Sequence, residues 1–514
     1  MRYFLLLLVF TCVLYSDEDS KRRALFNSLD PSSISQHLAF YDLYGDSEEG
    51  KDALKTSWKL LTKKVSTDDN IRPEMPNIVQ NLVDLINHPQ KKSTLDVVYQ
   101  EETLQCIESL AKNFPNRKLL GYHIANEADI EKLPEKELEL TSAFLLTQFD
   151  EGPEKEKQMR LFEASLDLMA LQILARLNDH ATPLEKVRAI NDLIFYELEF
   201  RFPPHSIYAK NVDTFTFLSS VLESRRGVCL GVSMLYLCLA ERLGLALEIV
   251  TPPGHIYLRY NDNNKVRNIE TTCRGVHLHS DEYLGINVID LEIRRKKEVI
   301  GMAFFNQASV WLNQSEWNKA KIAYEKTLKY MPSDLEANLL YAATLYLTDR
   351  PKDAKKWLLR CKDLVDKHVI TQDELHQDLF SDSMDKEALA SLFSFVDDTH
   401  DSIIRKKEAL AKAIEKNPQF RSGLFQLAIC WLQLSRMKEG IEVFEKLHTL
   451  DPDNIEVNYY LSALYFERWN IPLSYKYLLF AKKSAQAKNV MPKPLLELEV
   501  ALRKISPPLH NVIF

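Results

Sequence analysis

The chain has 514 residues, of which 46% are hydrophobic and 27% are charged. This length is too great for one hydrophobic core and predicts roughly three or four domains. The formal net charge of −8 argues against a nucleic-acid partner, because binding of that kind needs a basic surface. Seven scattered cysteines with no Cys-x-x-Cys pair argue against a disulfide scaffold.

Residues 1–16 have the pattern of a targeting or anchoring segment. Arg2 precedes the uncharged run YFLLLLVFTCVLYS. This run is shorter than the ~20 residues of a membrane span but suits the apolar region of a signal peptide. We predict export across a membrane, with any membrane association made only through the N-terminus. The alternatives are an uncleaved anchor and a cytoplasmic chain, and the sequence decides neither cleavage nor lipidation at Cys12.

Residues 17–150 are predicted to form a helical region without visible chemistry. The runs IVQNLVDLINH and ETLQCIESLAKNF repeat apolar residues every three or four positions, which is typical of amphipathic helices. We expect the first part of this region, up to residue 50, to be loosely ordered.

Residues 151–300 are predicted to form a mixed α+β domain. Two helical runs, LFEASLDLMALQILARL and PLEKVRAINDLIFYELEF, lead to a third helix that begins at Cys229 and ends before Gly244. Two short alternating runs, HIYLRY and VRNIETT, then flank the segment NDNNK. Alternation on both sides of an Asn/Asp cluster predicts a β-hairpin.

Cys229 is the candidate nucleophile of this domain. At a helix N-terminus, unpaired N–H groups and the helix dipole favour the thiolate over the thiol. The same N–H groups suit a developing oxyanion. Cys238 lies nine residues on, which at about 100° per residue places it on the opposite side of the helix. We therefore predict that Cys238 is a core residue.

His255 and Glu270 are expected to lie on one face of the hairpin. If Asp262 and Asn263 form a two-residue turn, paired residue numbers sum to 525, and His255 lies directly opposite Glu270. A turn slipped by one residue raises the sum to 527 and makes the pair diagonal, still on one face. In either register, the carboxylate can orient the imidazole and stabilise its cationic form.

From residue 301 to 490 the chain repeats itself with a 34-residue period. Small residues at 320 and 354, and again at 440 and 474, recur at that spacing. This period predicts tetratricopeptide repeats, whose stacked helix pairs form a concave surface for a protein or peptide partner. The predicted units are 301–334, 335–368, 387–420, 421–454 and 455–488, interrupted by the insertion VITQDELHQDLFSDSMDKE and followed by a tail at 491–514. The unit 387–420 is the least regular, because Lys406 occupies its small-residue position.

The stretch VLESRRGVCLGVSMLYLCLAERLGLALEIVTPPGHIYLRY, followed by NIETTCRG, resembles the transglutaminase-like core family. It is most similar to the bacterial branch that carries tetratricopeptide repeats behind this domain. The resemblance implies a papain-like fold and a Cys–His–acid site, which maps onto Cys229, His255 and Glu270. The acid of transglutaminases proper is usually aspartate, and Glu270 departs from it. With the N-terminal segment, the resemblance favours a periplasmic or membrane-anchored location in a bacterium.

The sequence thus predicts a multidomain, mainly α-helical protein: a helical N-terminal region, an α+β transglutaminase/papain-like core and a C-terminal α-solenoid of repeats. The predicted activity is thiol-dependent acyl transfer or hydrolysis at an amide or ester, with the repeats binding a protein partner. The alternative is an inactive domain that serves with its repeats as a binding scaffold. The substrate, the acyl acceptor and the oligomeric state do not follow from the sequence.

No cofactor and no metal are implied. The spacing of Cys273, His277 and His279 is not a recognised zinc pattern. Arg225 and Arg226 are interpreted as surface charges that flank the Cys229 helix. Asn268 alternates with Glu270 on one strand face and is a candidate contact of the imidazole.

Overall fold

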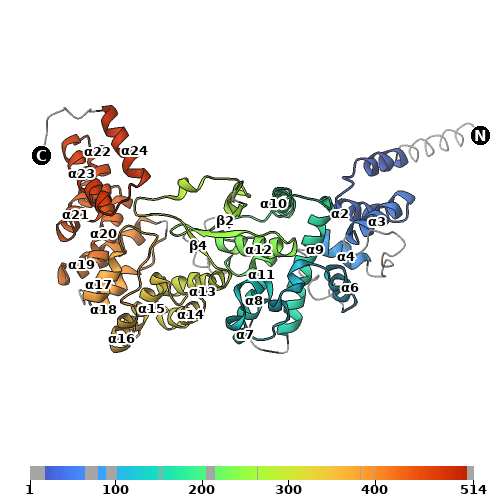
Figure 1. Ribbon diagram of the computed structural model, residues 1–514, viewed down its shortest axis with the longest axis horizontal. Helices are drawn as coiled ribbons and strands as arrows, with labels where there is room; N and C mark the ends of the chain where they lie inside the picture. Colours follow the sequence, from blue (N-terminus) through green and yellow to red (C-terminus); the bar gives the residue numbers. More distant parts are fainter. Residues whose placement is uncertain are drawn as a thin grey trace, which may run out of the picture. The chain divides into compact units, whose positions relative to one another are not determined.

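The computed structural model describes residues 18–63, 79–87, 101–149, 152, 154–203, 215–262, 264–381, 384–397 and 399–505. These residues are mainly helical and include a small antiparallel sheet (Figure 1). The predicted signal or anchor at residues 1–16 lies outside them. Within the described ranges, no helix combines the length and the apolar character needed to cross a bilayer.

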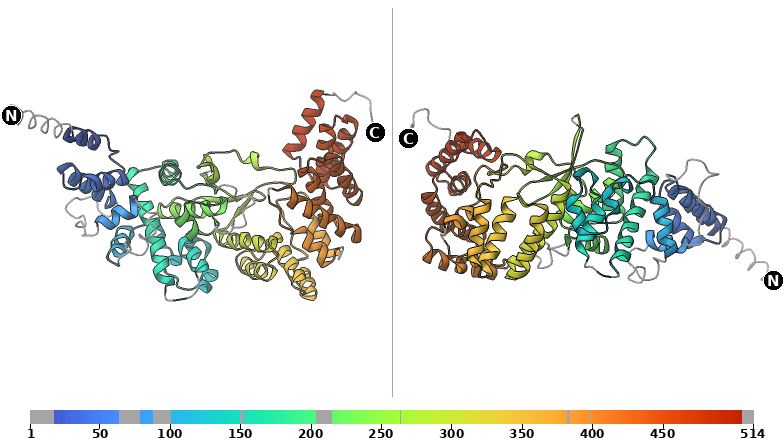
Figure 2. Two further views of the ribbon diagram at one scale, coloured as in Figure 1. Left: turned by 180° about the vertical axis from the view of Figure 1, so that it is seen from behind. Right: turned by 60° about the horizontal axis from the view of Figure 1, so that its bottom comes forward.

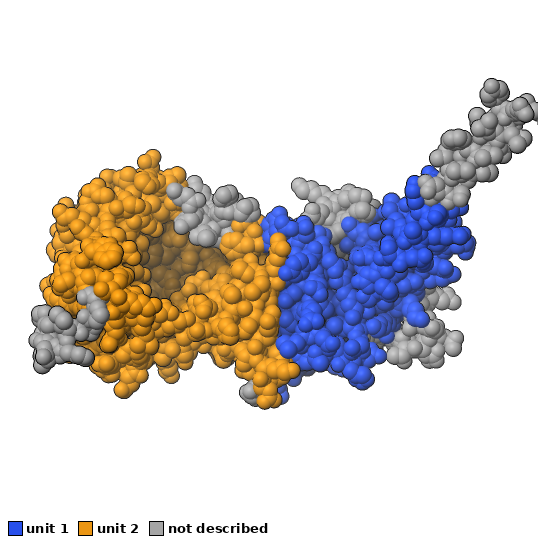
Figure 3. Space-filling view, turned by 90° about the horizontal axis from the view of Figure 1, so that it is seen from above, with its two compact units in different colours: residues 1–201, 218–226, 234–247 blue, residues 202–217, 227–233, 248–514 orange. Residues whose placement is uncertain are grey.

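The chain divides into two compact units, coloured separately in Figure 3. The first unit comprises Met1–Arg201, Leu218–Arg226 and Met234–Leu247. The second unit comprises Phe202–Phe217, Gly227–Ser233 and Glu248–Phe514. The first turn of the helix that begins at Cys229 therefore belongs to the second unit.

The first unit is built of helices around one long helix, α9 (Lys155–Arg176). Helix α9 is buried on most of its faces, as expected for a helix whose apolar residues are not confined to one stripe. Its helical neighbours are α2 (Ile34–Tyr44), α3 (Glu48–Leu61), α6 (Glu101–Ala111), α8 (Leu140–Gln148) and α10 (Pro183–Asn191). Further α-helices in this unit before residue 229 are α4 (Val79–Asn87), α7 (Glu127–Lys132) and α11 (Leu218–Ser224), and residues 18–27 are also helical.

Helix α2 corrects the expectation of loose order up to residue 50. The Ser33 side chain caps this helix by accepting from the backbone N–H of Gln36. Ile34, Leu38 and Phe40 are almost completely buried. An N-cap followed by a buried apolar face is sufficient to order this segment against its neighbours.

A buried charge cluster ties α8 and α9 to α12 (Cys229–Arg242) inside the first unit. The fully buried Arg242 guanidinium contacts the carboxylates of Glu163 and Asp167, the latter at 2.8 Å from Nε to Oδ1. Arg117 makes a second ion pair with Asp167. Burial, together with the neighbouring carboxylates of Glu139 and Asp167, raises the pKa of Glu163 to about 8, although Arg242 opposes this rise.

We expect the two sides of this cluster to respond unequally to substitution. Arg242→Met should lower the free energy of unfolding by about 3–5 kcal/mol, because it leaves buried carboxylates without their cation. Glu163→Gln should cost far less, because the glutamine amide oxygen can still accept a hydrogen bond from Arg242 and the Asp167 carboxylate remains as its counter-ion. Because the pKa of Glu163 is raised, its contribution to the free energy of unfolding falls as the pH rises from 4.5 to about 8. The stability of Glu163→Gln relative to the wild type should therefore increase over that range. Urea unfolding at several pH values measures both effects, and equal losses for the two variants would contradict this account.

The second unit contains a four-stranded antiparallel sheet in the order β3-β2-β1-β4. Its strands are β1 (Glu248–Thr251), β2 (Tyr257–Asn261), β3 (Val266–Ile269) and β4 (Glu292–Arg294). The predicted hairpin is β2–β3, and β1 and β4 flank it beyond β2. Strands β1 and β4 were not predicted, because they are short and lack the Asn/Asp cluster that marks the β2–β3 hairpin.

Helix pairs follow the sheet and confirm the predicted repeat array (Figures 1 and 2). The first helices of three repeats, α15 (Leu335–Leu347), α20 (Arg421–Gln433) and α22 (Ile455–Glu467), pack with α16 (Pro351–Cys361), α21 (Met437–Leu450) and α23 (Ile471–Ala487). The pair α13 (Lys296–Asn313) and α14 (Trp317–Tyr330) begins the array, and α24 (Lys493–Ile505) follows the last pair. The small residues that revealed the period, Ala320, Ala354 and Ser474, are fully buried where the helices cross closely.

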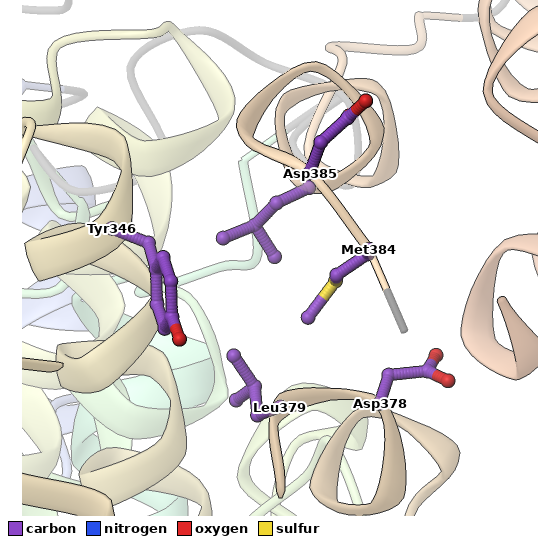
Figure 4. A pocket seen from close by; sticks show the side chains of 6 residues that line it. Tyr346, Asp378, Leu379, Met384 and Asp385 are labelled. Carbon is purple, nitrogen blue, oxygen red and sulfur yellow. The ribbon is translucent and has the colours of Figure 1, made fainter. Parts of the chain in front are cut away.

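Three further described helices lie between α16 and α20. Helix α17 (Glu374–Ser381) is formed by the insertion, whereas α18 (Lys386–Leu392) and α19 (His400–Lys416) fall almost entirely within the predicted repeat unit 387–420. Figure 4 shows a small hollow among these elements and α15, lined by Tyr346, Asp378, Leu379, Met384, Asp385 and Leu389. None of the three candidate catalytic residues lines it.

Candidate active site

Cys229 is the first residue of α12, as the sequence predicted. Gly244, with a positive φ of 61°, ends the helix two residues after its last helical position. The Cys229 side chain remains partly exposed, whereas Cys238 is completely buried. Burial raises the pKa of the Cys238 thiol well above its usual value, which agrees with its prediction as a core residue.

His255 lies in the turn between β1 and β2, and Glu270 follows directly after β3. The turn is held by a hydrogen bond from the His255 backbone N–H to the Pro252 carbonyl at 3.0 Å. The expected direct pairing is wrong, because Leu258 pairs with Ile269 and the paired residue numbers sum to 527. The imidazole and the carboxylate still meet, with 2.7 Å between His255 Nε2 and Glu270 Oε2.

A polar loop causes this shift in register. The Asp262 carboxylate accepts hydrogen bonds from the backbone N–H groups of Asn264 and Lys265, at 3.0 and 2.7 Å. The Asp262 N–H in turn donates to the Lys265 carbonyl. These bonds close a loop of four residues between the paired Asn261 and Val266, in place of the assumed two-residue turn.

The imidazole bridges the thiol and the carboxylate. Burial lowers the pKa of His255, but hydrogen bonds to Cys229 and Glu270 outweigh burial and raise that pKa to about 10. Glu270 shows the converse: burial raises its pKa, while hydrogen bonds from His255, Thr272 and Tyr283 bring it down to about 2. These shifts favour an imidazolium beside a carboxylate at neutral pH. Because Glu270 bonds to Nε2, the other ring nitrogen, Nδ1, is the one left for the Cys229 thiol.

Two threonines beside this pair were not identified from the sequence. Thr272 donates to Glu270 Oε1 from both its backbone N–H and its hydroxyl, at 3.0 and 2.6 Å. Thr271 lies within hydrogen-bonding distance of the Ser233 hydroxyl and the Cys229 carbonyl, so it ties the end of β3 to the first turn of α12. The motif Asn-Ile-Glu-Thr-Thr contains both threonines, but only the folded geometry shows their contacts.

Other polar residues near the site have structural contacts. Asn268 does not bond to the His255 ring; its side-chain amide donates to the Leu278 carbonyl at 2.6 Å and to the Ser280 hydroxyl at 3.0 Å. Arg225 is half-buried and donates to the Leu198 carbonyl, which corrects its interpretation as a surface charge. Among the described residues, no group of three His, Cys, Asp or Glu side chains is arranged to hold a metal ion.

Comparison with known proteins agrees with this architecture. Residues 160–288 match the family model of the transglutaminase-like superfamily. A UPF0162 protein of Xylella fastidiosa strain 9a5c is 23% identical over 219 residues, which cover 39% of this chain and 74% of that protein. The UPF0162 protein of strain Temecula1 is 22% identical over 244 residues, covering 43% and 83%.

Two solved structures resemble part of the chain. The pilF protein of Pseudomonas aeruginosa is 17% identical with a TM-score of 0.22, covering 41% of this chain and 86% of its own. YrrB, described as a tetratricopeptide-repeat protein with an unusual peptide-binding site, is 17% identical with a TM-score of 0.20, covering 40% and 92%. The family match at residues 160–288 and the helix pairs that follow the sheet give a chain with a transglutaminase-like domain and a helical repeat array.

We expect the pKa of His255 to depend on Glu270. In protein labelled with ¹³C at histidine Cε1, the His255 resonance should titrate near pH 10, and Glu270→Gln should move its midpoint down toward 6.5. A raised histidine pKa adds stability that is complete below pH 6.5 and is lost as the pH rises through about 10. The lowered pKa of Glu270 adds stability that is present above pH 4.5 and is lost as the pH falls through about 2.

The His255→Asn variant identifies the resonance by its disappearance. A His255 midpoint that stays unchanged in Glu270→Gln would contradict the coupling between the two side chains.

Proposed function

We propose that the protein is a thiol-dependent acyl transferase or hydrolase of the transglutaminase/cysteine-peptidase type. The series Cys229–His255–Glu270 carries this proposal: His255 and Glu270 share a hydrogen bond at 2.7 Å, and the Cys229 side chain helps to raise the pKa of the imidazole. Cys229 would be the nucleophile, His255 the proton carrier and Glu270 the acid that orients the ring. The match of residues 160–288 to the transglutaminase-like superfamily supports the same class of chemistry.

The His255 imidazole, held by Glu270 and interacting with Cys229, is placed to take the proton of the thiol. In acylation, the Cys229 sulfur would attack the carbonyl carbon of an amide or ester, and N–H groups at the start of α12 would stabilise the oxyanion. As the carbon–nitrogen or carbon–oxygen bond breaks, the imidazolium would give its proton to the leaving group. Water or an amine would then attack the thioester, pass a proton to His255 and release the thiolate.

The exposure of the three side chains supports access to a substrate. The His255 side chain is 25% exposed, whereas that of Glu270 is 3% exposed. Cys229 is also partly exposed. The reacting groups can therefore meet a ligand, while the orienting carboxylate is shielded from water.

We infer that the repeats bring a protein or peptide partner to this site. The second unit, which holds both the candidate site and the repeats, is hollowed on the face that Figure 3 shows. Stacked helix pairs of this kind provide an extended surface for a polypeptide.

We expect iodoacetamide to modify Cys229 selectively. At pH 7 its alkylation should be at least about tenfold faster than that of Cys273, because an adjacent imidazolium stabilises the thiolate. Cys273 is exposed and serves as the internal reference within the same molecule. His255→Ala should slow the reaction of Cys229 to the rate of Cys273. The matched control is His123→Ala, which removes an exposed histidine of the first unit and should leave both rates unchanged.

Peptide mapping by mass spectrometry gives the two rates. If wild-type Cys229 reacts no faster than Cys273, the enzymatic proposal fails, and the inactive binding scaffold becomes the better account.

The acyl acceptor can be identified with a glutamine-containing peptide and a fluorescent primary amine. A transferase should attach the amine to the peptide, whereas a hydrolase should release ammonia or cleave the chain without attachment. Cys229→Ala should abolish either product, because no other described side chain replaces the nucleophile of the series. A product that persists in Cys229→Ala would show that the reaction does not use this thiol.

A further inference from the structure

Tyr283 contacts the candidate site from a segment that sequence analysis did not single out. Its hydroxyl donates to Glu270 Oε2 at 2.5 Å, on the same oxygen that His255 Nε2 approaches. Its ring stacks on Tyr257 with 4.7 Å between centroids and lies nearly parallel to the His255 ring at 5.7 Å. Tyr283 therefore touches both members of the pair, through its hydroxyl and through its ring.

The hydroxyl of Tyr283 completes the set of donors around a buried carboxylate. Glu270 Oε1 accepts two hydrogen bonds from Thr272, and Oε2 is shared by His255 and Tyr283. A carboxylate held on both oxygens cannot rotate away from the imidazole. Loss of the tyrosine hydroxyl would leave Oε2 with the histidine alone and relax the direction of that bond.

Tyr283 belongs to a connecting segment, residues 276–291, which runs between β3 and β4. On the side of the sheet, the Ser280 hydroxyl bonds to the Tyr257 hydroxyl at 3.1 Å and accepts from the Asn268 amide at 3.0 Å. Ser280 and Tyr283 are the two ends of one short 3-10 helix, η9 (Ser280–Tyr283). The sheet thus holds one end of the turn that carries the tyrosine.

The repeat array holds the other end of the connecting segment. Ile289 donates its N–H to the His368 carbonyl at 2.7 Å, and Ile370 donates to the Asn287 carbonyl at 2.9 Å. The Asn287 side chain adds two hydrogen bonds to the backbone of Thr371, both at 2.8 Å. Residues 287–289 are therefore paired like a strand with residues 368–371.

Apolar packing extends this attachment into the last repeats. Ile286 and Ile370 share a buried cluster with residues of α22, α23 and α24, among them Ile455, Leu478 and Leu495. The insertion that interrupts the repeat period begins at Val369. Its first residues therefore form the surface to which the connecting segment binds. This contact gives the irregular insertion a structural role.

We propose that Tyr283 is a positioning residue of the Glu270–His255 pair and that the repeat array holds it in place through the connecting segment. The geometry carries this inference: the tyrosine lies three residues before Ile286, the first residue of the segment packed into the repeats. Its consequence for reactivity rests on the proposed function. A partner that moves the repeats would act on the orienting carboxylate rather than on the nucleophile.

The test begins with Tyr283→Phe, which keeps the stacked ring and removes only the hydroxyl. We expect the alkylation of Cys229 by iodoacetamide at pH 7 to slow by at least about tenfold. This factor corresponds to the free energy of one hydrogen bond to a charged group. The rate of Cys273 should stay unchanged. The control Tyr260→Phe removes a hydroxyl that bonds to Asp262 instead and should change neither rate.

A second variant tests the role of the repeats. Asn287→Ala removes both side-chain bonds to Thr371, and we expect a smaller loss, about threefold, in the Cys229 rate. In the Tyr283→Phe background, Asn287→Ala should have no further effect, because the repeats act through the hydroxyl that is already gone. Independent effects that multiply in the double variant would overturn the role of the repeats.

The His255 Nε2–H proton gives a readout that does not depend on thiol reactivity. In the wild type, its bond to Glu270 should protect the proton and shift its NMR resonance downfield. Tyr283→Phe should broaden or remove this signal while circular dichroism and the melting temperature change little; an unchanged signal would overturn the positioning role. If wild-type Cys229 proves unreactive, the proposed function fails, and this signal still decides whether Tyr283 positions the pair.

Discussion

The site depends on the burial of one carboxylate. A charged group removed from water is costly unless donors surround it, and Glu270 meets this requirement with His255, Tyr283 and two groups of Thr272. The donors come from the turn before β2, from η8 (Thr271–Cys273) and from the connecting segment. Every element that satisfies the charge is thereby fixed relative to the imidazole. The hydrogen bonds that stabilise the buried Glu270 carboxylate thus also fix the positions of His255, Thr272 and Tyr283.

Local patterns predicted the parts of the fold that local physics controls. The helix that begins at Cys229 and stops before Gly244 follows from an apolar run and a glycine that adopts a positive φ. The repeat array follows from small residues spaced 34 apart, because helices that cross closely accept only such residues at the contact. The proximity of His255 and Glu270 also followed from the hairpin, since either register left both on one face.

The remaining features depend on contacts that no short pattern records. The hairpin takes the slipped register rather than the direct one, because the Asp262 side chain closes a longer loop. Tyr283 lies 13 residues from Glu270 in sequence, in a stretch with no periodicity to mark it. The pairing of Asn287 with Thr371 joins residues 84 apart. Such contacts exist only once the sheet and the repeats are both in place.

The pairing of residues 287–289 with residues 368–371 also bears on the order in which the chain folds during synthesis. The connecting segment, which carries Tyr283, leaves the ribosome before residues 368–371, with which it pairs. It also precedes α22, α23 and α24, which enclose Ile286. Contacts between distant residues form late, because the intervening chain must first be ordered. The helix that begins at Cys229 can therefore form earlier than the contacts that hold the connecting segment, because those contacts need residues of α22, α23 and α24. The hydrogen bond from Tyr283 to Glu270 is thus expected to be among the last contacts of this region to form.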